Sequence, residues 1–153
     1  MFHIVLVEPE IPPNTGNVIR LAANTGAHLH LVHPLGFRLD DTRLRRAGLD
    51  YHEWARVAEH PSLVDCLRQV RPRRAWALST HGSVGYHQVR YAPGDALVFG
   101  CETGGLRREL TRFSPGRRLR LPMRPESRSM NLGNSVSVVL YEALRQQDFP
   151  ELE

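Results

Sequence analysis

The sequence predicts a single α/β domain over residues 1–153, with a mostly parallel sheet flanked by helices. Three observations support this. The length of 153 residues fits one domain with a real hydrophobic core. An apolar fraction of 41% and a charged fraction of 24% are ordinary for a globular protein. Strand-like and helix-like segments alternate along the chain, and such alternation favours a parallel sheet.

The first unit of this fold is a strand, a helix and a second strand. The apolar runs HIVLV (3–7) and HLHLVH (28–33) predict two buried strands. Asn14 is predicted to cap the helix between them, and Gly26 to end it in a left-handed conformation. A strand, a helix and a strand in this order form a βαβ unit, so the two strands should be parallel.

The rest of the chain continues the alternation without a repeat or a linker. Further strands are predicted at 75–80, 96–100 and 118–122. Helices are predicted at 40–51 (capped by Asp40 or Asp41), 62–70 (begun by Ser62), 109–113 and about 132–147. The last helix has one apolar face, made of Val136, Val139, Leu140, Ala143 and Leu144.

Charge and cysteine content limit the functional classes. The net charge is +4, and all 20 basic residues are arginine, which forks onto phosphate and suits a nucleic-acid partner. GC-rich codon usage also explains a chain without lysine. Cys66 and Cys101 form neither a disulfide framework nor a metal-binding spacing. With no signal peptide and no membrane-spanning run, we expect a cytoplasmic protein without a membrane partner.

Two polar segments accompany the early and middle parts of the predicted sheet. In PPNTGNVIR (12–20), Asn14 and Arg20 are read either as a cap and a surface charge or as parts of an anion site at a helix start. In VFGCETGGLRREL (98–110), glycines follow a strand. They indicate either close approach of a ligand or a tight connection with positive φ. Cys101 lacks a paired histidine base, which disfavours a cysteine nucleophile.

The third polar segment is SRSMNLGNSVSVVLYEA (127–143), which runs directly into the last helix. A helix start needs one capping side chain, but this run holds Ser127, Ser129, Asn131 and Asn134. The surplus indicates a polar ligand site. His28 and His30 share one face of a strand, but no third ligand follows at a metal-binding spacing, so no metal is expected.

Together these segments resemble the SPOUT superfamily of RNA methyltransferases. The match is closest to its small TrmL-type tRNA ribose 2′-O-methyltransferases, which modify the wobble cytidine or uridine. It runs from HIVLVEPEIPPNTGNVIRLAANTG through RLRRAGLDYHEW to LPMRPESRSMNLGNSVSVVLYEA. The resemblance implies a C-terminal trefoil knot, which is an exception to the rule against threaded chains. It also implies a homodimer whose active site is completed across the interface.

The resemblance implies S-adenosylmethionine as methyl donor, without a metal, held by three loops. The corresponding residues here are Leu78, Ser79, Thr80, Gly100, Glu102, Leu121, Met123, Ser129 and Met130. The catalytic candidates that match the family pattern are Asn14, Arg20, Glu102, Ser129 and Asn131. RNA contacts are expected from Arg43, Arg45, Arg46 and Arg128, and a dimer contact from Tyr141.

Several alternatives stay open at this level. Arg20 either accepts the proton of the ribose hydroxyl or orients that hydroxyl while water or phosphate takes the proton, and guanidinium holds its own proton strongly. The family motif E-T-R-G-L reads Glu102-Thr103-Gly104-Gly105-Leu106 here, so one basic side chain is missing. Methylation of another RNA site, or RNA binding without turnover, are the alternative functions. The tRNA isoacceptors and the preference between cytidine and uridine are not determined by the sequence.

Overall fold

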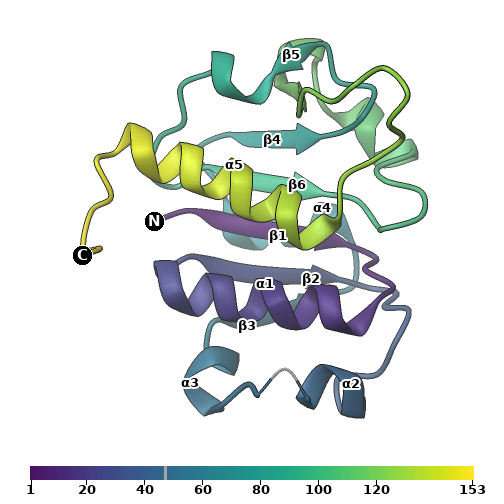
Figure 1. Ribbon diagram of the computed structural model, residues 1–153, viewed down its shortest axis with the longest axis vertical. Coiled ribbons are helices and arrows are strands. Elements are labelled where there is room, and N and C mark those ends of the chain that lie inside the picture. The colour runs from purple at the N-terminus through teal and green to yellow at the C-terminus, as the bar shows by residue number, and fades with distance from the viewer. Residues whose placement is uncertain (47) are drawn as a thin grey trace.

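The computed structural model describes residues 1–46 and 48–153, and these form one sheet of seven strands (Figure 1). The strand order is β3-β2-β1-β6-β4-β7-β5, and every pairing is parallel. The strands are β1 (His3–Val7), β2 (His28–Val32), β3 (Val57–His60), β4 (Ala75–Leu78), β5 (Val84–Gly85), β6 (Ala96–Phe99) and β7 (Arg118–Arg120). The predicted α/β fold with a mostly parallel sheet is confirmed.

Helices cover both faces of this sheet. Two long helices, α1 (Pro12–Thr25) and α5 (Leu132–Gln146), lie side by side on one face, and α4 (Leu63–Val70) covers the other (Figure 1). Shorter helices are α2 (Thr42–Arg45), α3 (Tyr51–Trp54) and the 3-10 helices η1 (Tyr86–Gln88), η2 (Arg108–Arg112) and η3 (Pro115–Arg117). A bilayer-crossing helix, which must be both long and apolar, does not occur in the described part of the chain.

Strands β1, β2, β4 and β6 contribute to two apolar cores, because successive side chains of a strand point to opposite faces. Leu29 and Leu31 of β2 pack with α1 and α5, whereas Val32 packs with α4 on the other side. Strands buried on both faces read as nearly continuous apolar runs, which is why β1 and β2 were detectable from the sequence. The predicted apolar face of α5 is also buried, at Val136, Val139, Leu140, Ala143 and Leu144.

The segment between β2 and β4 differs from the prediction. The sequence predicts one helix over 40–51, whereas the structure has two single-turn helices, α2 capped by Asp41 and α3 capped by Asp50. Gly48 lies between them with φ +72°, a left-handed conformation that ends a helix. Ala47, also in the predicted helix, lies outside the described residues. Strands β3 and β5 were not predicted, since β3 carries two exposed residues and β5 has only two residues.

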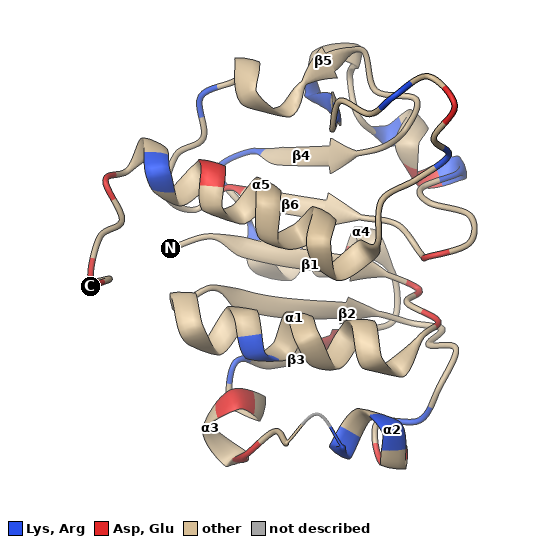
Figure 2. Cartoon of the chain, in the orientation of Figure 1, with Lys and Arg blue, Asp and Glu red and all other residues tan. Residues whose placement is uncertain are grey.

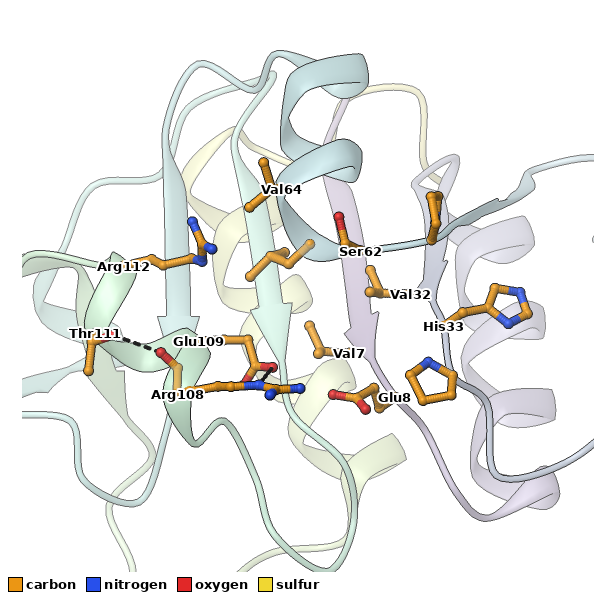
Figure 3. Close-up of a pocket in the computed structure, with 13 residues that line it drawn as sticks. Val7, Glu8, Val32, His33, Ser62, Val64, Arg108, Glu109, Thr111 and Arg112 are labelled. Carbon is orange, nitrogen blue, oxygen red and sulfur yellow. Dashed lines mark hydrogen bonds and ion pairs between the residues drawn. The ribbon is translucent and has the colours of Figure 1, made fainter.

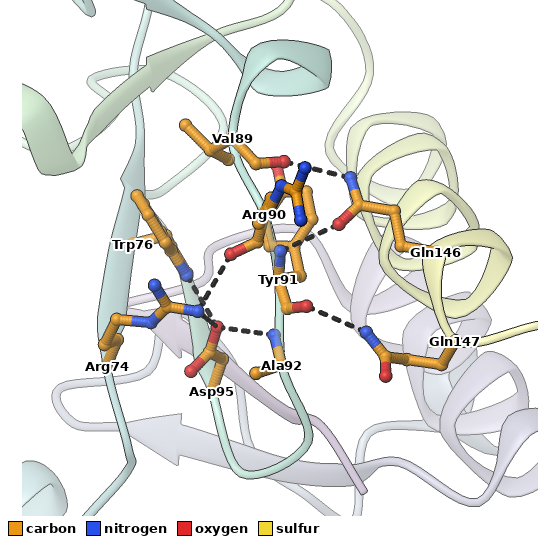
Figure 4. Close-up of polar contacts among 9 residues, drawn as sticks. All are labelled: Arg74, Trp76, Val89, Arg90, Tyr91, Ala92, Asp95, Gln146 and Gln147. Atoms are coloured by element: carbon orange, nitrogen blue, oxygen red, sulfur yellow. Dashed lines mark hydrogen bonds and ion pairs between the residues drawn. The ribbon is translucent and has the colours of Figure 1, made fainter.

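A buried polar network fastens the end of α5 to the sheet (Figure 4). Asp95 is fully buried and accepts hydrogen bonds from Trp76 Nε1 at 2.9 Å and from Arg74 Nη2 at 3.4 Å. Gln146 of α5 accepts a hydrogen bond from the backbone N–H of Tyr91 at 2.8 Å. Because buried polar groups are costly without partners, these bonds favour one position of α5 relative to the sheet.

A row of histidines crosses the sheet on the side of α4. His3 Nδ1 lies 3.1 Å from His30 Nε2, and His30 Nδ1 lies 2.9 Å from His60 Nε2. Burial, reinforced by the neighbouring His3 and His60, lowers the pKa of His30 from 6.5 to about 3. In the folded protein at neutral pH, His30 therefore holds no positive charge.

Stability should consequently fall on acidification below about pH 6.5. Between pH 6.5 and 3 the unfolded chain binds a proton at His30 that the folded chain does not, so stability rises with pH in this window. The expected loss attributable to His30 is up to about 1.4 kcal/mol per pH unit. Urea unfolding at pH 7.5, 6.0 and 5.0 measures it. The slope should become shallower in His30→Asn and stay unchanged in the control His52→Gln, an exposed site. An unchanged slope in His30→Asn would contradict the assignment.

Candidate active site

The loops that follow β4, β6 and β7 enclose a cavity of about 530 Å³ at one edge of the sheet. All three strands are parallel, so their carboxyl ends meet there, where open α/β sheets commonly bind ligands. The nine residues that the resemblance assigns to the cofactor all line this cavity: Leu78, Ser79, Thr80, Gly100, Glu102, Leu121, Met123, Ser129 and Met130. The fold therefore brings together three segments that are far apart in the sequence.

Four of the five catalytic candidates also line the cavity, namely Asn14, Glu102, Ser129 and Asn131. Other residues that line the cavity were not predicted, among them Ile11, His81, Phe99, Leu132 and Ser135. Most of them lie next to the polar segments, which follow the predicted strands. Their position near a strand end was therefore the signal by which the sequence could have identified them. Ile11, Phe99 and Leu132 form part of the apolar wall of the cavity, and a search for clusters of polar residues does not detect such side chains.

Glu102 connects the loop after β6 to the start of α1. Its Oε1 accepts a hydrogen bond from the backbone N–H of Glu10 at 2.9 Å, and its Oε2 accepts one from that of Ile11 at 2.7 Å. Oε2 also receives Asn14 Nδ2 at 3.4 Å. Free N–H groups and the positive end of the helix dipole attract a carboxylate at this place. Both carboxylate oxygens of Glu102 therefore already accept hydrogen bonds, and these bonds hold the loop after β6 against the start of α1.

The predicted capping role of Asn14 is wrong. Helix α1 begins at Pro12, its N-cap residue is Ile11, and no side chain caps it. Proline at the first helical positions starts the helix instead, since its fixed φ suits a helix and its missing N–H costs nothing there. Asn14 lies inside the first turn, where it is 8% exposed, and its Oδ1 accepts a hydrogen bond from Asn131 Nδ2 at 3.1 Å.

Asn131 has two functions in the structure. Its Oδ1 accepts a hydrogen bond from the backbone N–H of Asn134 at 3.1 Å and so caps α5, while its Nδ2 reaches Asn14. Together with the contact between Asn14 and Glu102, this bond forms a continuous series of side-chain contacts from Asn131 through Asn14 to Glu102. Each of the three polar segments of the sequence contributes one residue to this series of contacts.

The glycines after β6 form a tight connection. A Cβ atom at Gly100 would lie 2.0 Å from the carbonyl carbon of Gly105, and Gly105 itself has φ +62°. The structure shows the tight connection with positive φ, and the same glycines line the cavity, so the reading of close approach by a ligand stays open. Burial raises the pKa of the Cys101 thiol, and a hydrogen bond with Glu10 raises it further. A protonated thiol is a poor nucleophile, which agrees with the sequence-based reading.

Arg20 is the catalytic candidate that does not line the cavity of its own chain. It lies six residues beyond Asn14, or about 9 Å along α1. Its Nε donates to Glu53 Oε2 at 3.0 Å, and its Nη2 donates to the carbonyl oxygen of Gly48 at 2.9 Å. The side chain is 47% exposed. A role in catalysis therefore requires that a substrate or a second protomer approach this part of α1.

The remaining candidates lie at the surface. Arg43 and Arg45 belong to α2 and Arg46 follows it, and all three are exposed. Figure 2 shows this basic segment at one end of the molecule, with an acidic residue nearby, and Arg43 pairs with Asp41 at 3.3 Å. Arg128 is exposed at the rim of the cavity. Tyr141 is 45% exposed on α5.

The missing basic side chain at position 104 has a neighbour in its place. A Cβ atom at Gly104 would lie 2.6 Å from both Nε and Nη2 of Arg107. The guanidinium of Arg107 therefore occupies the space beside Gly104. Arg107 thus provides a basic group beside this loop, three positions after Gly104 in the sequence.

A second cavity, of about 410 Å³, lies at the carboxyl ends of β1 and β2 (Figure 3). It is lined by residues that include Glu8, His33, Arg108, Glu109 and Arg112. Its lining contains charges of both signs, and two of them form an ion pair: Arg108 Nε lies 3.6 Å from Glu109 Oε1. None of the residues predicted for a site lines it.

Cys66 lies beside the histidine row as a third potential metal ligand, which spacing in the sequence did not reveal. Ligand atoms of His30, His60 and Cys66 lie within 4.8 Å of one another. However, the two imidazole nitrogens face each other at 2.9 Å, the distance of a hydrogen bond. A zinc ion between them needs about 2.0–2.1 Å to each nitrogen. The hydrogen bond alone accounts for this contact.

Comparison with known proteins gives the chain's relationships. The family model of the SpoU rRNA Methylase family matches residues 1–141. A tRNA (cytidine(34)-2'-O)-methyltransferase from Acidovorax sp. strain JS42 is 59% identical over 97% of this chain and 94% of its own.

Solved structures agree with this relationship. A structure described as giving insight into the 2-OH methylation of C/U34 on tRNA has a TM-score of 0.87 and 43% identity, and it covers 97% of both chains. The AdoMet-bound rRNA methyltransferase from Sinorhizobium meliloti has a TM-score of 0.80 and 27% identity, over 94% of this chain and 56% of its own.

Proposed function

Because this chain belongs to the SpoU methylase family, we propose that it is a tRNA methyltransferase acting on the ribose of nucleotide 34. The reaction transfers a methyl group from S-adenosylmethionine to the 2′-hydroxyl of the wobble cytidine or uridine. The single observation that carries the proposal is the cavity where the three motif segments meet. Relatives named for this activity align over nearly the whole chain.

The cavity fits S-adenosylmethionine in size and chemistry. Its volume of about 530 Å³ falls within the range of roughly 300–1,000 Å³ typical of small-molecule sites. Apolar side chains such as Leu78, Phe99 and Leu121 suit a purine ring, and the polar loop after β7 suits the ribose and amino-acid parts. The cofactor supplies an electrophilic methyl group. Within the same proposal, the C-terminal segment passes through a loop and so forms the trefoil knot that the family implies.

The protein has to orient a ribose hydroxyl toward that methyl group and remove its proton. Ser129 and Asn131 are exposed at the cavity and carry neutral polar groups suited to a ribose. Glu102 acts indirectly, by fixing Asn14 and the start of α1. Both of its oxygens already accept hydrogen bonds, from the backbone N–H groups of Glu10 and Ile11 and from Asn14 Nδ2.

Arg20 would complete the site from a second protomer. It lies outside the cavity of its own chain, so a homodimer is the simplest arrangement that brings a guanidinium to the reacting ribose. Exposed apolar residues on α5 and at the cavity rim suit such an interface: Ile11, Met130, Val138 and Tyr141. The exposed arginines Arg43, Arg45, Arg46 and Arg128 would then contact tRNA phosphates. A tRNA substrate implies a cytoplasmic location.

Methylation assays on unmodified tRNA transcripts test the proposed function. Incubation with labelled S-adenosylmethionine should place one methyl group on nucleotide 34. A matched transcript with 2′-deoxyribose at that nucleotide should take up no label, because the attacking hydroxyl is missing. Label that maps to another nucleotide, or to ribosomal RNA, would favour the alternative of another RNA site. Cofactor binding without transfer to any RNA would favour an RNA-binding protein without turnover.

A further inference from the structure

Arg20 is held through two nitrogens of its guanidinium, Nε and Nη2, and the third nitrogen, Nη1, is left open by the described residues. Nε and Nη2 donate to the two oxygens of Glu53 at 3.0 and 3.4 Å, and Nη2 also donates to the carbonyl oxygen of Gly48 at 2.9 Å. Among the described residues, Nη1 has no hydrogen-bond partner. A guanidinium has a fixed planar fork, so fixing two of its nitrogens also fixes the direction of the third.

Glu53 is itself fixed by a capping box. Asp50 caps α3 by accepting a hydrogen bond from the Glu53 backbone N–H at 3.2 Å, and Glu53 Oε1 accepts one from the Asp50 backbone N–H at 3.4 Å. The Glu53 side chain is only 14% exposed. The carboxylate that holds Arg20 is thus tied to the backbone, unlike a surface carboxylate on a freely rotating side chain.

Gly48 allows the second contact. Its φ of +72° turns the chain so that its carbonyl oxygen meets Arg20, and a Cβ atom there would lie 3.4 Å from Arg20 Nη2. The segment RLRRAGLDYHEW therefore has a structural purpose that its residue types alone did not reveal. It places the carboxylate of Glu53 and the backbone carbonyl of Gly48 around one guanidinium. Figure 2 shows α1 and α3, which carry the pair, side by side.

We propose that Glu53 is a positioning residue, which acts through Arg20 by aiming its Nη1 group at the ribose or phosphate of the RNA. This inference rests on the proposed function. The same contact supports orientation over base catalysis as the role of Arg20. The hydrogen bond and the charge of Glu53 raise the pKa of Arg20, so the guanidinium keeps its proton more firmly.

A double-mutant cycle tests this role. Glu53→Gln removes the charge and one of the two carboxylate acceptors, and it should lower kcat by about 100-fold, the typical cost of a misplaced catalytic group. The KM for S-adenosylmethionine should stay unchanged, since Glu53 does not line the cavity. Adding Glu53→Gln to Arg20→Ala should cost nothing further, because both changes remove the same interaction. The matched control is Glu59→Gln, which removes an exposed carboxylate paired with His33.

A second measurement does not depend on activity. Hydrogen exchange of the Arg20 Nε–H, followed by NMR, should be faster in Glu53→Gln and unchanged in Glu59→Gln. If the wild-type protein methylates no RNA but this exchange is still faster in Glu53→Gln, the proposed function is wrong. The positioning of Arg20 by Glu53 is then still supported. Normal kcat and unchanged exchange in Glu53→Gln would overturn the positioning role. Additive losses in the double mutant would also overturn it, since Glu53 would then act independently of Arg20.

Discussion

Arg20→Lys should lower the rate of methyl transfer by at least about 100-fold while leaving the affinity for S-adenosylmethionine unchanged. Lysine keeps the positive charge but not the planar fork, so it cannot bind Glu53 and Gly48 and also present a further N–H group in a fixed direction. Single-turnover kinetics gives the rate, and calorimetry gives the affinity. Arg68→Lys, an exposed site on α4, is the matched control and should behave like the wild type.

Mixing two inactive variants tests whether Arg20 acts across a dimer. Arg20→Ala leaves the residues of the cavity in place, and Asn131→Ala, a change in the cavity, leaves Arg20 in place. If each site combines Arg20 of one protomer with the cavity of the other, a mixed dimer has one intact site. Half of the dimers in an equal mixture are mixed, so about a quarter of the wild-type activity should return. No recovery after exchange of subunits would mean that Arg20 serves its own chain or that no such dimer forms.

Gly100→Ala should weaken binding of S-adenosylmethionine by roughly 10- to 100-fold. The added Cβ atom would lie 2.0 Å from the carbonyl carbon of Gly105 and 2.2 Å from the backbone nitrogen of Leu106. No side-chain rotation relieves an overlap with backbone, so the loop that carries Glu102 and one wall of the cavity has to move. Calorimetry with S-adenosylmethionine measures the effect, and thermal unfolding reports the accompanying loss of stability.

The control for this substitution is Gly116→Ala. A Cβ atom at Gly116 meets nothing within 4 Å, and this glycine does not line the cavity. It should bind S-adenosylmethionine like the wild type. Equal affinities of Gly100→Ala and the wild type would show that the loop after β6 does not shape the binding site.

Local sequence patterns predicted the elements whose burial is uniform. β1 and β2 are buried on both faces, so their apolar runs identify them directly, and the apolar face of α5 follows the helical period. β3 was missed because Glu59 and Ala58 are exposed and its pattern resembles a loop. The two turns α2 and α3 were merged, since the conformation of Gly48 is not encoded in apolar periodicity.

The candidate site shows the same division. Matching residues to a family pattern was enough to select the nine cofactor candidates, which all line one cavity. The partners of those residues could not be predicted in this way. Asn14 reads as a cap in isolation but bonds Asn131, which is 117 residues away, and Arg20 reads as a surface charge but is held by Glu53.

By itself, the sequence determined an α/β architecture with a mostly parallel sheet and the position of the last helix, and the family resemblance selected nine of the residues around the cavity. These depend on burial, on capping and on residue type, which are properties of short segments. Only the tertiary structure decided which polar atoms meet: Glu102 with the start of α1, Asn14 with Asn131, and Arg20 with Glu53 and Gly48. Hydrogen bonds depend on distances of a few tenths of an ångström between segments far apart in the chain, and only the packing of the whole sheet sets those distances.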